Sequence, residues 1–362
     1  MPSALDSLLR PELADAKAYV PHPGSYRIRL DANEAPPLLP PSVRARLIEE
    51  MGRVSFERYP DATATELRTA IAERLGVAPE EILLGVGSDE LITILLTAVA
   101  RPRRGAEPPA ILTTTPTFVM YRLSARLRGE RVVEVPLDEA WDLAEASMVR
   151  GIEVAEPHLV FIASPNNPTG TMVSPERLTR VIEAASRSLV VLDEAYVDYA
   201  DRHWLELFRQ HENVVVLRTL SKIGFAALRV GWLVGPRNLV AELDKLRLPY
   251  NLNGVSQALA TVVFRELWSE VTEMTAAVKA ERGRLANALG SLPFLSVSPS
   301  QANFLWVKTE RPAEAMFKEL GERGILVRSF HGSGGRLAQQ LRITVGTPAE
   351  NDELVRCLRE LA

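Results

Sequence analysis

Short apolar segments alternate with amphipathic stretches over roughly residues 60 to 240. The apolar segments are rich in β-branched residues and lie at 110–113, 131–135, 159–163, 189–192, 214–217 and 230–234. Segments of this length and composition predict buried strands, and the stretches between them predict helices that pack on the sheet. Strands that alternate with helices form a mostly parallel sheet. The pattern therefore predicts an α/β fold with helices covering the sheet.

The pattern changes after residue 252. Residues 253–290 carry no strand signal and predict a long helix that leads into a second unit. In that unit we expect strands and helices in an α+β arrangement at 303–307, 312–323, 325–328, 341–345 and 348–361. We therefore predict three parts: an N-terminal arm that joins the small domain and covers the site, a large domain, and a bridging helix with a small C-terminal domain, at 1–42, 43–252 and 253–362.

Prolines mark several of the predicted boundaries. Ser174-Pro175 and Thr347-Pro348 each place a capping residue before proline at the first helical position, which predicts two helix starts. The proline-rich segment Ala35 to Pro41 predicts an extended strap, because proline there disfavours a helix.

Composition narrows the class of protein. The chain has 362 residues, 46% of them hydrophobic, and a formal net charge of -4, so it lacks the basic field that holds nucleic acid. Cys357 is the only cysteine, which excludes an internal disulfide and a cysteine-based metal cluster, and we predict no metal site. No export signal is visible, and the longest apolar run, Leu91 to Ala100, is too short to cross a membrane. We expect a cytoplasmic protein.

Lys222 stands in the most informative local context. It ends the segment Thr219-Leu220-Ser221-Lys222, and Arg229 follows after a short loop that contains a glycine. An isolated lysine is usually a solvated surface charge. A lysine that follows a buried strand, beside a hydroxyl and a guanidinium, instead suits a Schiff base with pyridoxal phosphate, with Ser221 and Arg229 at the cofactor phosphate. The same amine can carry a proton to and from the substrate carbon.

Asp193 ends the apolar run at 189–192, where the strands of an α/β sheet bind ligands. The alternative is a simple helix cap. As a carboxylate at the pyridine nitrogen, Asp193 would keep that nitrogen protonated, so that the ring accepts an electron pair. Tyr196, and Asn167 in the turn 164–170, can both donate to the phenolate oxygen, although Asn167 alone would be a turn residue.

Glycines open the helix that follows residue 86. In the segment 85–90, the backbone N–H groups and the hydroxyl of Ser88 can hold a phosphate at a helix N-terminus. Glu90 replaces the third glycine of the dinucleotide fingerprint, so a nucleotide-binding reading is disfavoured. Phe118 can stack on the pyridine ring, although an aromatic residue before a helix is usually part of the core. We interpret Gly332-Ser333-Gly334-Gly335 as a flexible connection.

Together these motifs resemble the fold-type I pyridoxal phosphate enzymes of the aminotransferase group, and most specifically the histidinol-phosphate aminotransferase family. The resemblance covers nearly the whole chain and includes the segments 30–36, 58–61, 85–90, 166–170, 193–196, 221–222 and 341–347. It implies a large domain with a mostly parallel sheet in an α/β/α sandwich and a smaller α+β domain. Phe118 departs from the tyrosine that relatives often carry, and the loop from Lys222 to Arg229 is one residue shorter than in some of them.

The resemblance also implies roles for individual residues. Lys222 would bind the cofactor, Asp193 would pair with its ring nitrogen, and Asn167 and Tyr196 would contact its phenolate oxygen. Around the phosphate the family pattern places four residues of the chain itself and one from a second subunit of a homodimer: Ser88, Asp89, Ser221, Arg229 and Tyr59.

On the substrate side, the resemblance assigns the anion to Arg342. Arg328 ends the predicted strand 325–328, which we expect to neighbour the strand of Arg342, so both arginines can share the pocket. Either arginine could instead be a surface ion-pair partner. Tyr19 and Asn33 would close the site from the N-terminal arm.

Three functions remain open at this stage. The first is transamination between histidinol phosphate and 2-oxoglutarate in histidine biosynthesis. The second keeps the cofactor but acts on aromatic amino acids or decarboxylates threonine phosphate. The third is a non-catalytic regulator that binds pyridoxal phosphate, but such regulators carry a DNA-binding domain for which the N-terminal arm is too short. Pocket shape decides between the substrates.

Overall fold

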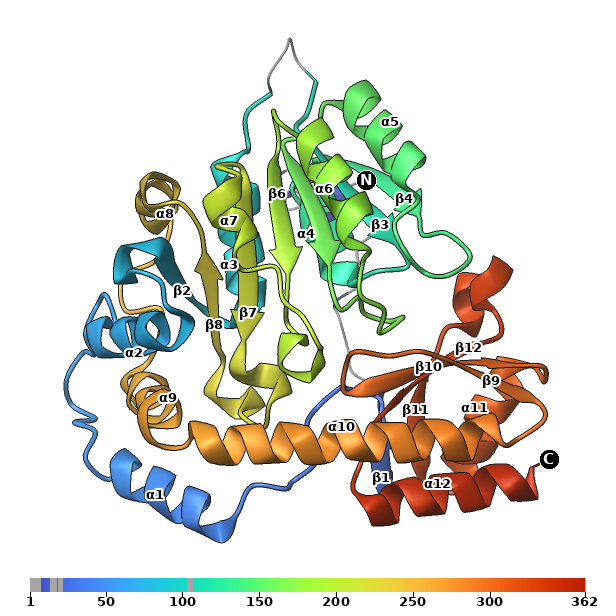
Figure 1. The fold of residues 1–362 in the computed structure, drawn as a ribbon. Helices are drawn as coiled ribbons and strands as arrows, with labels where there is room; N and C mark the ends of the chain where they lie inside the picture. The colour runs from blue at the N-terminus through green and yellow to red at the C-terminus, as the bar shows by residue number, and fades with distance from the viewer. Residues whose placement is uncertain (1–7, 14–17, 19–21, 103–106, 362) are drawn as a thin grey trace.

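The computed structural model describes residues 8–13, 18, 22–102 and 107–361. Its larger sheet has seven strands (Figure 1), in the order β2 (Ile82–Val86), β8 (Val230–Val234), β7 (Val214–Thr219), β6 (Leu189–Asp193), β5 (Leu159–Ala163), β3 (Ala110–Thr115) and β4 (Arg131–Pro136). The strands from β7 to β4 are parallel, and β8 runs antiparallel to both of its neighbours. The prediction of a mostly parallel sheet is therefore confirmed.

Helices cover both faces of this sheet. On one face lie α3 (Gly87–Ala98), α4 (Val119–Arg126) and α8 (Arg237–Asp244). On the other lie α2 (Thr65–Leu75), α5 (Glu145–Ala155), α6 (Pro175–Ala184), α7 (Leu207–Gln210) and α9 (Gly254–Glu266). In β6, Val190 and Leu192 pack in one apolar cluster and Val191 packs in the other, because successive side chains of a strand point to opposite faces. The result is an α/β/α sandwich.

The smaller sheet has five strands, in the order β1 (Ile28–Leu30), β11 (Ile325–Ser329), β12 (Gln340–Thr344), β10 (Phe304–Thr309) and β9 (Leu295–Ser298). Strand β1 comes from the N-terminal segment and pairs parallel to β11, whereas the other neighbours are antiparallel. Helices α11 (Ala313–Glu322) and α12 (Pro348–Glu360) pack against this sheet. The domain boundaries at residues 42 and 252 stay predictions.

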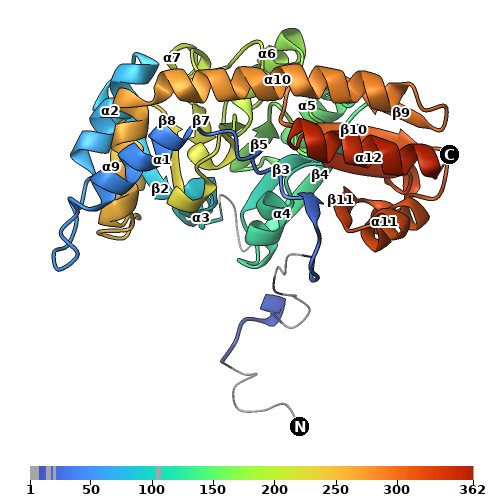
Figure 2. The ribbon, with the colours of Figure 1, turned by 90° about the horizontal axis from the view of Figure 1, so that it is seen from below.

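Helix α10 (Trp268–Gly290) links the two sheets; in Figure 1 it runs below the larger sheet and continues across the smaller domain. Viewed from below, it spans the length of the molecule, and α1 (Pro41–Met51) lies beside α9 (Figure 2). The first half of α10 buries Val271 and Met274 in the core of the larger sheet, and its second half buries Leu285 and Leu289 under the smaller sheet. This shared helix holds the two cores together.

Several boundaries differ from the sequence prediction. The single long helix over 253–290 is wrong, because the chain breaks at Leu267 (φ -112°, ψ 14°) into α9 and α10. Thr347 caps α12 by accepting a hydrogen bond from the Glu350 amide, as predicted. Ser174 does precede α6, but its hydroxyl donates to Asp142 instead of capping the helix.

Three short strands carried too little pattern for prediction. These are β1, β2 and β9, of three to five residues each. The strap predicted over 35–41 is free of helix up to Pro40, but its last residue, Pro41, opens α1. Within the described ranges, no helix combines the length and the apolar character needed to cross a membrane.

Candidate functional site

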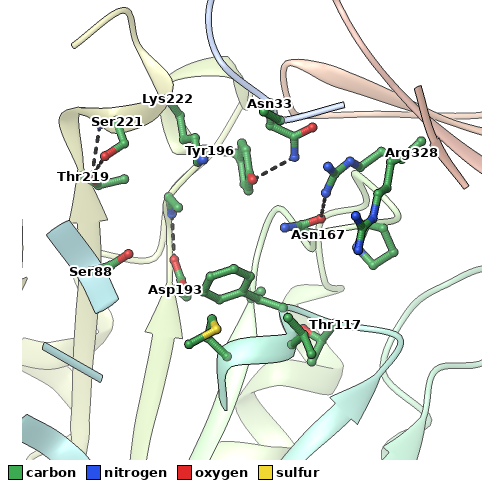
Figure 3. A pocket seen from close by; sticks show the side chains of 18 of the residues that line it. Asn33, Ser88, Thr117, Asn167, Asp193, Tyr196, Thr219, Ser221, Lys222 and Arg328 are labelled. Carbon is green, nitrogen blue, oxygen red and sulfur yellow. Dashed lines mark hydrogen bonds between the residues drawn. The ribbon is translucent and has the colours of Figure 1, made fainter. Parts of the chain in front are cut away.

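A cavity of about 490 Å³ is lined by residues from both sheets (Figure 3). Twelve of the residues singled out from the sequence line it: Asn33, Ser88, Asp89, Phe118, Asn167, Asp193, Tyr196, Ser221, Lys222, Arg229, Arg328 and Arg342. They come from segments that lie up to about 310 residues apart along the chain. The structure therefore brings almost the whole predicted site together.

Two predicted site residues are not in this set. Tyr59 is 83% exposed and stacks on Tyr250, with ring centroids 4.7 Å apart. It was assigned to the site of a second subunit, which a single chain does not test. Tyr19 lies outside the described residues.

Strand β7 positions Lys222. The strand ends at Thr219, whose side chain accepts a hydrogen bond from the Ser221 amide at 3.1 Å and so caps the single turn Leu220–Lys222. The hydroxyl of Tyr199 donates to the Lys222 carbonyl at 2.6 Å. Within the described part of the chain, the Lys222 amine takes part in no hydrogen bond or ion pair, and it lies 5.8 Å from the Tyr196 ring centroid. The backbone is held while the amine is left available in the cavity.

Asp193 is held by two donors at the end of β6. The residue is 5% exposed, and its carboxylate accepts hydrogen bonds from the Tyr121 hydroxyl at 2.5 Å and from the Ala195 amide at 2.9 Å. Burial raises the pKa of Asp193 above its ordinary value, and these two hydrogen bonds oppose that rise. The Tyr121 ring stacks on Phe161 and meets Phe118 edge to face. These ring contacts fix the position of the Tyr121 hydroxyl, which donates to Asp193.

Asn33 connects the N-terminal segment to the cavity. It is buried with φ at 56°, and its side-chain amide donates to the Tyr196 hydroxyl at 2.9 Å. Its own backbone amide donates to Thr344 Oγ1 at 3.0 Å, and its carbonyl accepts from Asn303 Nδ2 at 3.0 Å. The Tyr196 ring packs edge to face on Phe304. Asn33 therefore joins Tyr196 to the smaller sheet.

Arg342 reaches across the cavity from β12. Its Nη1 donates to Asn167 Oδ1 at 2.6 Å, and its Nη2 donates to the carbonyl of Asp31. Arg342 is 9% exposed, and on the neighbouring strand β11 Arg328 lies directly opposite it. Figure 3 shows Arg328 beside Asn167 in the cavity. Two guanidinium groups at the cavity wall make it suitable for an anion.

The opposite end of the cavity is shaped by glycines. A Cβ on Gly87, whose φ is +71°, would lie 2.6 Å from the Arg229 guanidinium, and one on Gly231 would lie 2.6 Å from the Ser88 amide nitrogen. A larger residue at Gly231 would force the backbone of α3 away, and one at Gly87 would displace the Arg229 guanidinium. Arg229 itself has φ at 52° and accepts the Gly87 amide hydrogen bond on its carbonyl at 2.9 Å.

The Arg229 guanidinium is therefore packed against the N-terminus of α3. Its Nη1 donates to Ser221 Oγ at 3.2 Å, and its Nη2 lies 3.4 Å from Asp89 Oδ2. A helix N-terminus, two hydroxyl groups and a guanidinium form a cradle that suits a phosphate group. Asp89 shares that cradle as a hydrogen-bonding partner of the arginine.

Sequence reasoning missed some lining residues: His22, Arg29, Asp31, Thr117, Tyr121, Thr219 and Phe330. One of them had a usable signal. Tyr121 follows Phe118, the residue before α4, by three positions, so the two rings were expected to lie near one another.

Comparison with known proteins gives concordant matches. The family of class I and II aminotransferases matches residues 27–358. The histidinol-phosphate aminotransferase of Methylibium petroleiphilum is 39% identical over 358 residues, which cover 98% of this chain and 95% of the relative. Histidinol-phosphate aminotransferase 1 of Carboxydothermus hydrogenoformans is 42% identical over 352 residues, covering 96% and 97%. The solved histidinol-phosphate aminotransferase of Sinorhizobium meliloti, in complex with pyridoxal-5'-phosphate, has a TM-score of 0.83 at 26% identity, covering 93% of this chain and 92% of that one.

Proposed function

The chain belongs to the family of class I and II aminotransferases, and from that membership we propose that it transfers the amino group of L-histidinol phosphate to 2-oxoglutarate. The products are imidazole acetol phosphate and glutamate, and the reaction is a step of L-histidine biosynthesis in the cytoplasm. The observation that carries the proposal is that one cavity joins the available amine of Lys222 to a wall with two opposed arginines. A transaminase for a phosphorylated amine needs both.

The cavity residues fit pyridoxal phosphate as the cofactor. Gly87 and Gly231 let the Arg229 guanidinium and the N-terminus of α3 pack closely together, and with Ser221 these groups form a cradle of donors that suits a phosphate. Lys222 would hold the aldehyde carbon and Asp193 the ring nitrogen. The remaining contacts fall to Asn167 and Tyr196 at the phenolate oxygen, Phe118 at the ring face, and Ser88, Asp89, Ser221 and Arg229 at the phosphate.

Bound pyridoxal phosphate supplies an electron sink for the pair released when the bond between Cα and hydrogen breaks. The protein supplies the proton transfer and the charge. Within each half-reaction the Lys222 amine would move one proton between the substrate Cα and the cofactor carbon, so that it ends each half-reaction unchanged. An ionised Asp193 in this water-poor site would favour a protonated ring nitrogen. Asn167 has its amide oxygen bound to Arg342, so its amide nitrogen stays available as a donor.

The arginines would bind both substrates in turn. A planar guanidinium pairs bidentately with a phosphate or a carboxylate, so Arg342 can serve histidinol phosphate in one half-reaction and glutamate in the other. Arg328 on the adjacent strand adds a second positive charge for the doubly charged phosphate. Asn33 closes the site from the N-terminal segment through its bond to Tyr196.

We further propose a homodimer in which Tyr59 of one subunit completes the phosphate cradle of the other. Large apolar side chains are exposed on three segments: Ile48 and Met51 on α1, Phe56 in the loop that carries Tyr59, and Leu248 and Tyr250 after α8. Tyr59 stacks on Tyr250, so the second and third of these segments lie together. A cluster of exposed apolar side chains supports an interface with a second copy.

Mixing two variants tests the shared site. Tyr59→Ala and Lys222→Ala should each have little activity, and subunit exchange should restore part of it, because one site of the mixed dimer keeps both residues. Each variant carried through exchange alone is the control. Verified exchange without any recovery would argue against a shared site.

The substrate assignment is tested by comparing kcat/KM for histidinol phosphate, phenylalanine, tyrosine and threonine phosphate under one set of conditions. Histidinol phosphate should be preferred, and histidinol without its phosphate should be a poor donor. Preference for an aromatic amino acid, or release of carbon dioxide from threonine phosphate, would overturn the assignment and leave only the cofactor chemistry.

A further inference from the structure

We propose that Tyr121 is a positioning residue for Asp193: its phenol aims the buried carboxylate and keeps it available as the anionic partner of a pyridine nitrogen. The idea rests on the proposed cofactor site but goes beyond it, because Tyr121 itself is assigned no contact with cofactor or substrate. It follows from three features of the structure, namely the packing of Tyr121, the partners of Asp193 and the charges around them.

Packing leaves the Tyr121 ring a single position. The side chain is fully buried. Its ring stacks on Phe161 at a centroid distance of 4.7 Å and an interplanar angle of 10°, and Phe118 meets it edge to face at 5.5 Å. Two ring contacts at these distances fix both the plane and the rotation of the phenol. The hydroxyl is therefore held 2.5 Å from Asp193 Oδ2 before any ligand arrives.

Asp193 depends on few partners for its charge. Among the described residues it forms no ion pair, and its hydrogen bonds come from the Tyr121 hydroxyl and the Ala195 amide. The amide occupies Oδ1 and the phenol occupies Oδ2, so each oxygen is oriented by one donor. An ionised carboxylate has about four acceptor positions, so positions remain for a ring N–H. Tyr121 thus supplies half of the hydrogen bonds that stabilise the anion.

The surrounding charges make that contribution matter. Burial raises the pKa of Asp193, Asp89 on α3 adds to the rise, and the hydrogen bonds together with the charge of Lys222 counteract it. Burial and Asp193 raise the pKa of Tyr121 well above its ordinary value, with smaller contributions from Tyr196 and Asp89. The phenol therefore stays protonated and can only donate to an ionised Asp193. Removal of this donor makes the carboxylate more basic.

A more basic carboxylate would draw the shared proton away from the ring nitrogen. The test uses the full-length holoenzyme with pyridoxal phosphate that carries the heavy nitrogen isotope in its ring. In Tyr121→Phe the nitrogen NMR shift should move toward that of an unprotonated pyridine, and kcat should fall on the order of tenfold with little change in KM. Thr113→Val is the matched control, because it removes a buried hydroxyl that donates to the Phe161 carbonyl and not to Asp193. An unchanged nitrogen shift in Tyr121→Phe overturns the proposal.

A second measurement needs no cofactor. Asp193 has a raised pKa in the folded protein, so its contribution to stability is present below the unfolded pKa and is lost as the pH rises through the folded pKa. Tyr121→Phe raises that pKa further, so it should lower the urea midpoint of the apoprotein more at about pH 8 than at about pH 5. In an Asp193→Asn background the pH dependence of this loss should vanish. The same loss at both pH values would reduce Tyr121 to a packing residue.

These measurements involve no amino donor, so they do not depend on the histidinol phosphate assignment. If the protein failed to bind pyridoxal phosphate, the proposed function would fail, and the apoprotein comparison alone would decide the role of Tyr121.

Discussion

The two walls of the cavity differ in the charges that they bring together. The strand-end wall consists of Ser88, Asp193, Ser221, Lys222 and Arg229, at the edge of the seven-stranded sheet. The arginine wall consists of Arg29, Arg328 and Arg342, on the three strands β1, β11 and β12 of the smaller sheet. Strand register and hydrogen bonds hold both walls, but the strand-end wall combines groups of opposite charge, whereas the arginine wall gathers like charges.

The two walls suit different ligands. In the strand-end wall, Asp193 pairs in register with Leu217 on β7, and a capped turn then leads to Lys222. In the arginine wall, Arg328 and Arg342 lie directly opposite each other on antiparallel strands. Two like charges in opposite positions destabilise a sheet. A preorganised wall suits a group that stays bound, and a wall with excess positive charge suits an anion that enters and leaves. The predictions below test this contrast.

Removal of the strand-end amine should have the largest effect. Lys222→Ala should lower turnover by about 10⁴-fold or more, because no other group in the cavity replaces a proton carrier at that position. The control is Lys245→Ala, which removes an exposed lysine paired with Glu242. Borohydride reduction of the holoenzyme followed by peptide mapping should label Lys222. A label on another lysine would refute the assignment.

Loss of the strand-end charge should come next. Asp193→Asn keeps the shape of the side chain but removes the negative charge, so turnover should fall by about 10² to 10³-fold while the fold is retained. Stopped-flow measurement of each half-reaction should place the loss in proton abstraction. If both half-reactions kept rates near those of the unchanged protein, the negative charge of Asp193 would not be needed for proton abstraction.

The central arginine should have a smaller effect. Arg342→Lys keeps the charge but loses the planar fork, so kcat/KM should fall by about 10 to 100-fold in both half-reactions. Cofactor affinity, measured by equilibrium dialysis, should not change, because the phosphate cradle lies on the other wall. A loss confined to one substrate would mean that the two anions do not share Arg342.

The outer arginine should matter least. Arg29 is 43% exposed on its side chain and lies 3.4 Å from Asp31, so its charge is partly compensated and open to solvent. Arg29→Gln should raise the KM for histidinol phosphate by about two to fivefold, and about 0.5 M salt should abolish the difference. If Arg29→Gln lowered kcat/KM as much as Arg342→Lys does, at every salt concentration, Arg29 would contribute to substrate binding as strongly as Arg342.

Much of the strand-end wall followed from the sequence. Asp193 and Lys222 each come directly after a β-rich apolar run, and parallel strands end at the same edge, so their proximity could be predicted without coordinates. Residue type and position also suggested Asn167, Tyr196 and most of the phosphate cradle. The family resemblance added Asp89, and the structure places them all at one cavity. Their catalytic roles stay predictions, as does the contribution of Tyr59.

Other features had no local signal. The phenol of Tyr121 lies 72 positions from Asp193, and its bond depends on how α4 rests on the sheet. Strand β1 has three residues, too few for a periodic pattern. The break at Leu267 is equally hidden, because apolar residues on both sides continue the helical pattern.

The sequence by itself determined the chemistry of this protein: which amine, which carboxylate and which arginines are present, and which of them follow strands. Those properties are local, because strand pattern and residue type depend on near neighbours in the chain. Only the tertiary structure decided which groups touch. Asn33 meets Thr344 across 311 positions and Arg342 meets Asn167 across 175, and such pairs exist because of sheet order and helix packing, which no short stretch of sequence encodes.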